Sequence, residues 1–299
     1  MDAVIQSLSD TLINEIINAV GLPKTASTRR VFDLLFHKAA GRLAEIGVTF
    51  DRLIGRDGFP SACGWVLANW CRDITTRGSE SVPQSGPLLV ISNHAGAYDS
   101  VVIASRLGRN DLKFIASDVA FLKNLPSTSE HFLFVSADDA FNRMAGARSG
   151  IRHMQDGGAL ILFGTGLIDP DPAVYPGAEK EIENWSPSID LFLRQVPDAN
   201  VVVTIVSGIV SPRWARHPVT WLKRIAWQKR RLAEFGQVLQ QLFFPGSLYV
   251  SPRVSFAPPV PVTQLIRESG TKRVLPAVIR RGKALLAEHI AWTKSFQKE

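Results

Sequence analysis

The chain has 299 residues, 45% of them hydrophobic and 20% charged, with a formal net charge of +7. This composition is typical of a folded globular protein, and the length allows one large domain or a core domain with a smaller helical one. No apolar run approaches the roughly 18 residues of a membrane span, and the N-terminus lacks the basic-then-apolar pattern of a signal peptide. Cys63 and Cys71 lack metal-site spacing, which favours thiols in a reducing compartment and predicts a cytoplasmic protein.

The first part of the chain, residues 1–78, has helical periodicity. Apolar residues recur at helical spacing from Leu8 through Leu12 to Ile16, and a second pattern runs from Val31 to Leu43. We therefore expect an N-terminal helical region over 1–78 and a second unit over 79–299.

Short apolar runs alternate with helical patterns from Pro83 onward. Strands are predicted at 87–92, 112–116, 132–136, 159–163, 200–206 and 249–256. Helices are predicted around 98–107, 142–155, 188–195 and 219–242. This alternation predicts an α/β fold with a mixed, mostly parallel sheet flanked by helices.

The segment VISNHAGAYDS, residues 90–100, carries the first candidate for chemistry. If His94 ends a strand and Asp99 lies in the first turn of a helix, the carboxylate can reach one imidazole nitrogen. That contact would fix the tautomer and leave the other nitrogen as a general base for a substrate hydroxyl. The alternative is that both residues only cap a helix.

Other kinds of catalytic site lack their sequence patterns. No G-x-S-x-G element frames a nucleophilic serine, and both cysteines lie in the helical region. The remaining five histidines show no metal-binding spacing, so no metal is expected, and nucleotide-binding glycine motifs are missing. These observations favour direct attack by a substrate hydroxyl without a resident cofactor.

Residues 77–100, RGSESVPQSGPLLVISNHAGAYDS, resemble the start of the catalytic domain in the glycerolipid acyltransferase superfamily. Those enzymes carry N-H-x-x-x-x-D after a strand and acylate glycerol 3-phosphate or lysophosphatidate from acyl-CoA or acyl carrier protein. The resemblance covers roughly residues 77–260 and makes 79–299 the catalytic domain. It implies that His94 is the base, that Asp99 orients it, and that Asn93 lies at the substrate.

Two later motifs of that superfamily depart from its pattern here. Where the family has an arginine for the acceptor phosphate, this chain has Ser136 and Ala137, so Arg143 or Arg148 of the next helix would have to substitute, unless both are only solvated. The third motif is LFGTGLIDPDP, residues 162–172, which keeps the small turn but lacks the acidic residue and the arginine. Thr165, Gly166 and Asp169 are its candidate acceptor contacts.

A basic segment lies between Pro212 and Ala233, with seven Lys or Arg residues and no acidic one. On a helical wheel of 218–244, one side carries apolar residues and the other carries Lys223, Arg224, Arg230 and Arg231 with Trp227. This pattern predicts peripheral contact with an anionic membrane surface, on its inner face, or else a solvated helix. Nucleic acid is not expected, because stacking platforms and groove-reading motifs are not evident.

The function predicted from these patterns is an O-acyltransferase of lipid metabolism and phospholipid biosynthesis. An acyl group would pass from an acyl-CoA or acyl-carrier thioester to a hydroxyl of a glycerolipid-type or polyol acceptor. Two alternatives remain open: a catalytically silent acyl- or lipid-binding protein, and an esterase or thioesterase that uses the same pair on water.

Overall fold

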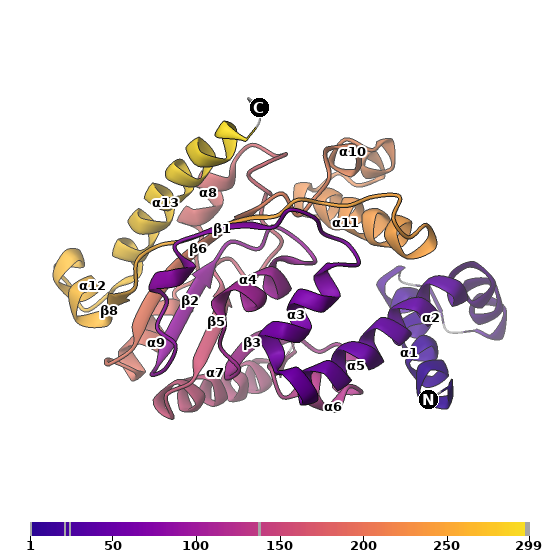
Figure 1. Ribbon diagram of the computed structural model, residues 1–299, viewed down its shortest axis with the longest axis horizontal. Coiled ribbons are helices and arrows are strands. Elements are labelled where there is room, and N and C mark those ends of the chain that lie inside the picture. Colours follow the sequence, from indigo (N-terminus) through magenta and orange to yellow (C-terminus); the bar gives the residue numbers. More distant parts are fainter. Residues whose placement is uncertain (1, 21, 24, 137–138, 297–299) are drawn as a thin grey trace.

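The computed structural model describes residues 2–20, 22–23, 25–136 and 139–296. These residues form one eight-stranded sheet with the order β1-β7-β6-β2-β5-β3-β4, and β8 pairs with β6 (Figure 1). The strands are β1 Thr75–Arg77, β2 Leu88–Ser92, β3 Leu112–Ser117, β4 Phe132–Val135, β5 Ala159–Phe163, β6 Asn200–Ser207, β7 Arg253–Phe256 and β8 Val260–Pro261. Strands β2 to β6 run parallel, whereas β7 and β8 are antiparallel to β6. The fold is α/β with a mixed, mostly parallel sheet, as predicted.

The central strands are apolar throughout because both faces of the sheet are covered. Every residue of β2 is buried: Leu88 and Val90 pack into the core on one face, and Leu89 and Ile91 pack into the core on the other. A parallel strand covered on both sides has no solvent face that would need polar residues. This explains why strand periodicity is weak in the sequence here.

Two sets of helices provide these covers (Figure 1). One core contains residues of α2 (Ala26–Asp57), α3 (Phe59–Leu67), α4 (Asp99–Leu107) and α11 (Ala226–Phe243). The opposite core contains residues of α7 (Ala140–Gln155), α8 (Ala178–Glu183), α9 (Ser188–Gln195), α12 (Val262–Ser269) and α13 (Leu275–Ser295). The other helical elements are α1 (Asp2–Val20), η1 (Ser79–Ser81), α5 (Ala120–Lys123), α6 (Pro126–Ser129), α10 (Pro212–Ala215) and η2 (Pro218–Leu222).

The helices of the N-terminal region, α1 to α3, end at Leu67, and a strand follows before residue 78. Strand β1 lies within the predicted helical range and pairs with β7, where Thr76 is opposite Val254. Helices α2 and α3 share a hydrophobic core with the sheet, because Ile54 and Phe59 belong to the same cluster as Val90. The helical region therefore packs as part of the α/β unit.

The predicted helix over 219–242 is interrupted. The 3-10 helix η2 ends at Leu222, Lys223 is extended with ψ at 142°, and α11 begins only at Ala226. Helices in proteins are stabilised mainly by packing an apolar face. The side chains of 221–227 are exposed, and the first buried residue of α11 is Ala233, so nothing holds the intervening segment in a helix. The predicted strand over 249–256 is also shorter and begins at Arg253.

Candidate active site

A histidine–aspartate pair lies just beyond the carboxyl end of β2. The Nδ1 atom of His94 is 2.8 Å from the Oδ2 atom of Asp99, the first residue of α4. Asp99 is completely buried, and its carboxylate also accepts hydrogen bonds from the backbone N–H groups of Gly96 (3.0 Å) and Ser100 (2.6 Å). Asp99 thus orders the turn into α4 and also fixes the imidazole ring, so the two roles weighed from the sequence are combined.

The turn between the two residues requires a glycine. Gly96 has φ at 154°, within the range that side-chain-bearing residues rarely adopt. A Cβ atom there would lie 2.3 Å from Oε1 of Glu234 and 2.8 Å from Cγ2 of Ile209. The close approach of α11 to this turn therefore depends on Gly96.

The loop after β5 holds the backbone of His94. The His94 N–H donates to Oδ2 of Asp169 (2.9 Å), and the Asp169 N–H donates to the carbonyl of His94 (2.7 Å). The Thr165 hydroxyl donates to the other oxygen of Asp169 (2.7 Å). The imidazole stacks on Phe163 with ring centroids 4.3 Å apart. His94 is consequently held through its backbone and its ring.

Two residues predicted to contact substrate have structural partners instead. The side-chain amide of Asn93 is buried and exchanges hydrogen bonds with the backbone of Val206 in β6 (2.8 and 2.9 Å). Asp169 is only 3% exposed, and each of its oxygens already has a donor. These hydrogen bonds join both side chains to the part of the chain that supports His94, and their contact with a substrate stays a prediction.

A groove of about 540 Å³ opens beside His94, at the carboxyl ends of β3, β4 and β5. Ligand sites in α/β proteins commonly lie at this edge of the sheet. The apolar part of the lining comes from Phe114, Phe132, Val135, Leu162 and Phe192. Its polar part comes from hydroxyl groups at Ser100, Ser117, Thr165, Ser186 and Ser188, together with Arg143. The groove can therefore accept a ligand with both an apolar and a hydroxyl-bearing part.

The other predicted acceptor residues divide into two groups. Thr165, Gly166 and Arg143 line the groove. Arg148 is exposed on α7 and is not among the residues that line it, so its contact with an acceptor stays a prediction. Ala137 lies outside the described residues, and the Ser136 N–H donates to Asn142 Oδ1 (2.6 Å) at the start of α7.

The electrostatic surroundings make His94 strongly basic. Burial lowers the pKa of His94, but the charge and hydrogen bond of Asp99, with the charges of Glu234 and Asp169, outweigh burial and raise it to about 9. Burial also raises the pKa of Asp169 to about 6. A base with this pKa holds its own proton at neutral pH and becomes free to take a proton from a hydroxyl group as the pH rises toward 9.

Sequence reasoning missed Glu234, an acidic residue that packs against Gly96 in the turn between His94 and Asp99. It lies on the buried face of α11, and burial raises its pKa to about 8. The available signal was weak: Glu234 is the single acidic residue between Ala226 and Phe243. Only the packing of α11 over Gly96 brings it to the site.

The predicted membrane-contact residues also separate in the structure. Arg230 turns inward, and its guanidinium donates twice to the carbonyl of Ile168 (2.8 and 3.0 Å) in the loop after β5. Lys223, Arg224, Trp227 and Arg231 are exposed. Because the predicted helix is interrupted, the wheel faces are wrong, and Trp221 (74%), Leu222 (78%) and Ile225 (53%) are exposed beside the basic residues.

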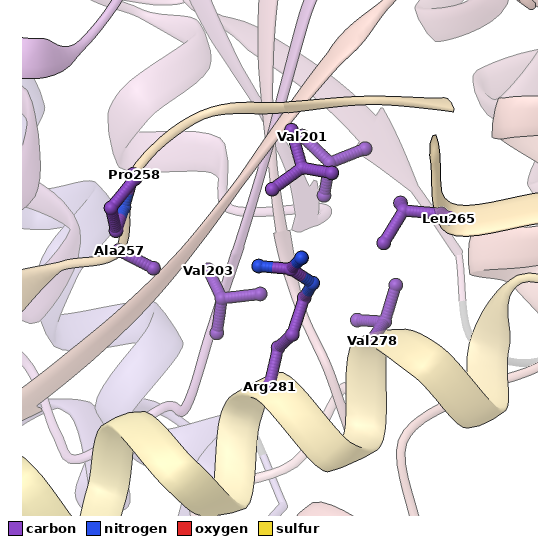
Figure 2. A pocket seen from close by; sticks show the side chains of 8 residues that line it. Val201, Val203, Ala257, Pro258, Leu265, Val278 and Arg281 are labelled. Carbon is purple, nitrogen blue, oxygen red and sulfur yellow. The ribbon is translucent and has the colours of Figure 1, made fainter. Parts of the chain in front are cut away.

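A second, much smaller pocket lies between β6, α12 and α13 (Figure 2). Its volume is about 10 Å³, room for about one water molecule, and valines 201, 203 and 278 surround it. The Arg281 side chain reaches into it from α13 (Figure 2). Its guanidinium pairs with Glu268 at 2.6 Å. This pocket is too small to hold a substrate.

Within the part of the chain that is described, no three His, Cys, Asp or Glu side chains form a candidate metal site. No helix of that part combines the length and the apolar character needed to cross a bilayer. Cys63 and Cys71 are both buried and form no disulfide.

The comparisons with known proteins give a structural likeness. No family model matches the chain, and no curated protein matches it. The structure is similar to the crystal structure of the 1-acyl-sn-glycerophosphate (LPA) acyltransferase, PlsC, from Thermotoga maritima, with a TM-score of 0.43. The two chains are 17% identical, and the match covers 94% of this chain and 97% of that one. At this level of similarity, function has to be argued from the residues of the site.

Proposed function

We propose that the protein is an acyltransferase that moves an acyl group from a thioester to a hydroxyl of a lipid or polyol acceptor. The observation that carries the proposal is the His94–Asp99 pair at 2.8 Å, with His94 on the wall of the groove. The motif around this pair also resembles that of the glycerolipid acyltransferases. The acyl thioester, from CoA or an acyl carrier protein, is a co-substrate, and no resident cofactor is part of the proposal.

In the proposed reaction His94 acts as the general base. Asp99 occupies Nδ1, which leaves Nε2 as the nitrogen that can meet a ligand in the groove. Nε2 takes the proton of the acceptor hydroxyl while its oxygen attacks the thioester carbonyl. The carbon–sulfur bond then breaks, and the departing thiolate takes the proton from the imidazolium. The products are an ester and a thiol, and the histidine returns to its neutral form.

The lining of the groove supports this assignment of substrates. Phe114, Phe132 and Leu162 offer apolar surface to an acyl chain, and hydroxyl groups such as those of Ser117 and Ser186 offer hydrogen bonds to a polar acceptor. Among the lining residues described, Arg143 is the arginine. A phosphorylated acceptor would depend on Arg143, because phosphate recognition normally uses charge-assisted donors.

The test is a transfer assay with labelled acyl-CoA and acyl carrier protein donors and a panel of matched acceptors with and without phosphate. Transfer is expected only when an acceptor hydroxyl is supplied, and an Arg143→Gln variant should lose any preference for the phosphorylated acceptors. Thioester consumption without an acceptor would instead identify a thioesterase. Tight binding of acyl-CoA with neither reaction would identify a silent binding protein, and either result contradicts the proposal.

We also propose that segment 221–231 contacts an anionic membrane surface. Exposed Trp221, Leu222 and Ile225 can insert at the interface while Lys223 and Arg224 meet lipid headgroups. Because Arg230 binds the carbonyl of Ile168, the start of α11 lies against the loop that supports His94. Membrane contact here would bring the lipid close to the groove.

Sedimentation with anionic vesicles tests this contact. The double variant Lys223→Gln, Arg224→Gln should weaken binding at low salt, since each cation near an anionic surface contributes about 1 kcal/mol. Trp221→Ala should weaken binding also at high salt, because its contribution is apolar. The matched control is Lys272→Gln with Arg273→Gln, two exposed cations next to α12, far from α11 (Figure 1). Equal binding by both double variants would contradict the proposal.

A further inference from the structure

A buried carboxylate lies directly against the turn that joins His94 to Asp99. Glu234 is 8% exposed, and its Oε1 atom is buried with no hydrogen-bond partner among the described residues. Oε1 lies where it would be 2.3 Å from a Cβ atom at Gly96, so the carboxylate covers this glycine closely. A buried carboxylate oxygen without a hydrogen-bond partner costs free energy of folding, so Glu234 is not explained by stability alone.

The same face of α11 shows what a purely structural residue does in this environment. One turn further along, Gln237 accepts from the Ser211 N–H (2.7 Å) and donates to the Ile209 carbonyl (2.9 Å). Gln241 donates to the carbonyls of Trp70 and Leu248 and accepts from the Tyr98 hydroxyl. Both amides satisfy their hydrogen bonds without a charge. The residue next to the catalytic pair is the one that has a carboxylate instead.

Several neighbouring groups act on the pKa of the Glu234 carboxyl group. His94 lowers the pKa of Glu234, Asp99 raises it, and the Ala97 backbone amide and Arg231 lower it, although burial raises it most. In return Glu234 raises the pKa of His94, as do Asp99 and Asp169, and it also raises those of Tyr98 and Tyr175. Glu234 is therefore coupled to the imidazole through space, without a direct hydrogen bond.

We propose that Glu234 is a positioning residue that acts through His94, and that its buried carboxylate stabilises the imidazolium formed when His94 takes a proton. This inference rests on the proposed role of His94 as a general base. A negative charge next to the ring lowers the energy of the protonated base and so strengthens it. Asp99 fixes the ring by hydrogen bonding, while Glu234 adds charge from α11 above about pH 8, where its own carboxyl group is ionised.

The first experiment measures the ring itself and needs no substrate. The His94 imidazole is titrated by NMR in the wild type and in Glu234→Gln. Its signals are assigned by their absence in His94→Gln. Replacing the carboxylate by an amide of the same shape should weaken the proton affinity of His94 about tenfold. The matched control is Glu183→Gln, which removes an exposed carboxylate paired with Lys283 and should leave the His94 titration unchanged.

The second experiment measures the rate of acyl transfer against pH. Glu234→Gln should move the acidic limb of kcat/KM toward lower pH and reduce the plateau several-fold, because the base becomes weaker. Glu234→Met also removes the charge and should give the same pH profile as Glu234→Gln. Glu234→Asp keeps a carboxylate and should recover part of the wild-type rate. Melting temperatures check that each variant is folded.

These results separate the two proposals. If wild-type protein transfers no acyl group but the titration of His94 changes in Glu234→Gln, the proposed function fails and the coupling stands. If folded Glu234→Gln titrates like the wild type, or if only the Met variant changes the limb, Glu234 has a packing role and the inference is overturned.

Discussion

Two histidines of this protein have opposite chemical surroundings. His94 pairs with a carboxylate at 2.8 Å and lies on the wall of the groove. His289, in α13, is fully buried, and its two ring nitrogens lie 2.7 Å from the hydroxyls of Ser207 and Ser255. Both rings have a hydrogen-bond partner at Nδ1, so hydrogen bonding alone does not distinguish a reactive histidine from a structural one.

The difference lies in the charges around each ring. Carboxylates surround His94 and raise its pKa to about 9. Burial and the guanidinium groups of Arg77 and Arg253 lower the pKa of His289 to about 4, so this ring stays neutral. Arg77 donates to Ser255 Oγ, and a consistent assignment has that hydroxyl donating to Nδ1 of His289, with the Nε2–H donating to Ser207. His289 can join α13 to the sheet, but it has no access for a substrate and no anion to stabilise its charge.

The largest expected effect comes from His94→Ala. If His94 is the general base, the rate of acyl transfer should fall roughly a thousandfold, within the range attributed to such catalysis. The fold should persist, because the backbone contacts of His94 with Asp169 do not need the ring. Steady-state kinetics and a melting curve measure both, and a folded variant with near-normal activity would remove the functional contrast between the histidines.

Asp99→Asn should have the next largest effect, about a hundredfold on kcat. The amide can present its NH₂ group to Nδ1 and select the wrong tautomer, and it removes the charge that favours the imidazolium. The acidic limb of the pH–rate profile should also move to lower pH. A loss of activity that is entirely explained by unfolding would show that Asp99 acts only as the support of the α4 turn.

The sequence was enough to predict the part of the site that is local. His94 and Asp99 are five residues apart in one strand–turn–helix unit, so the pattern of that unit determines their meeting. The same reasoning did not foresee the internal hydrogen bonds of Asn93 and Asp169, because nothing local indicates that Val206 and His94 occupy their polar atoms. Their burial depends on strands and loops far away in the chain.

The fold class could be predicted from the alternation of strands and helices, but distant packing could not. Glu234 reaches Gly96 only because α11 packs on that turn, and His289 reaches Ser207 only because α13 packs on the sheet. In both cases the two residues lie far apart in the sequence. The interruption at Lys223 was missed because the residues there favour a helix individually, while no core contact holds them in one. Apolar residues at helical spacing predict a helix correctly only where the fold buries them.

His289→Ala should act on stability rather than on activity. The change leaves a cavity and removes the partner of two buried hydroxyls, which should reduce the free energy of unfolding by about 3 kcal/mol. The kcat of the folded variant should equal that of the wild type. Urea unfolding and kinetics at a temperature where both proteins are folded make the measurement. A large loss of kcat in folded protein would mean that the two histidines are not functionally distinct.

The smallest effect is the pH dependence of stability, and here the two histidines should act in opposite directions. The folded state raises the pKa of His94 from 6.5 to about 9, so it binds more protons than the unfolded chain in that window. Its contribution is present below pH 6.5 and is lost as the pH rises toward 9. The folded state lowers the pKa of His289 from 6.5 to about 4, so its contribution is present above pH 6.5 and is lost as the pH falls toward 4.

The two contributions can be separated with variants that cannot carry a charge. Relative to the wild type, His289→Gln should lose less stability between pH 6.5 and 5, and His94→Gln should lose less between pH 6.5 and 8, each by about 2 kcal/mol. Urea unfolding across these ranges gives the difference curves, in which the carboxylates common to both proteins cancel. Two flat difference curves would show that neither ring changes its pKa on folding, whereas slopes of opposite sign would show that the surroundings of the two histidines favour opposite charge states of the ring.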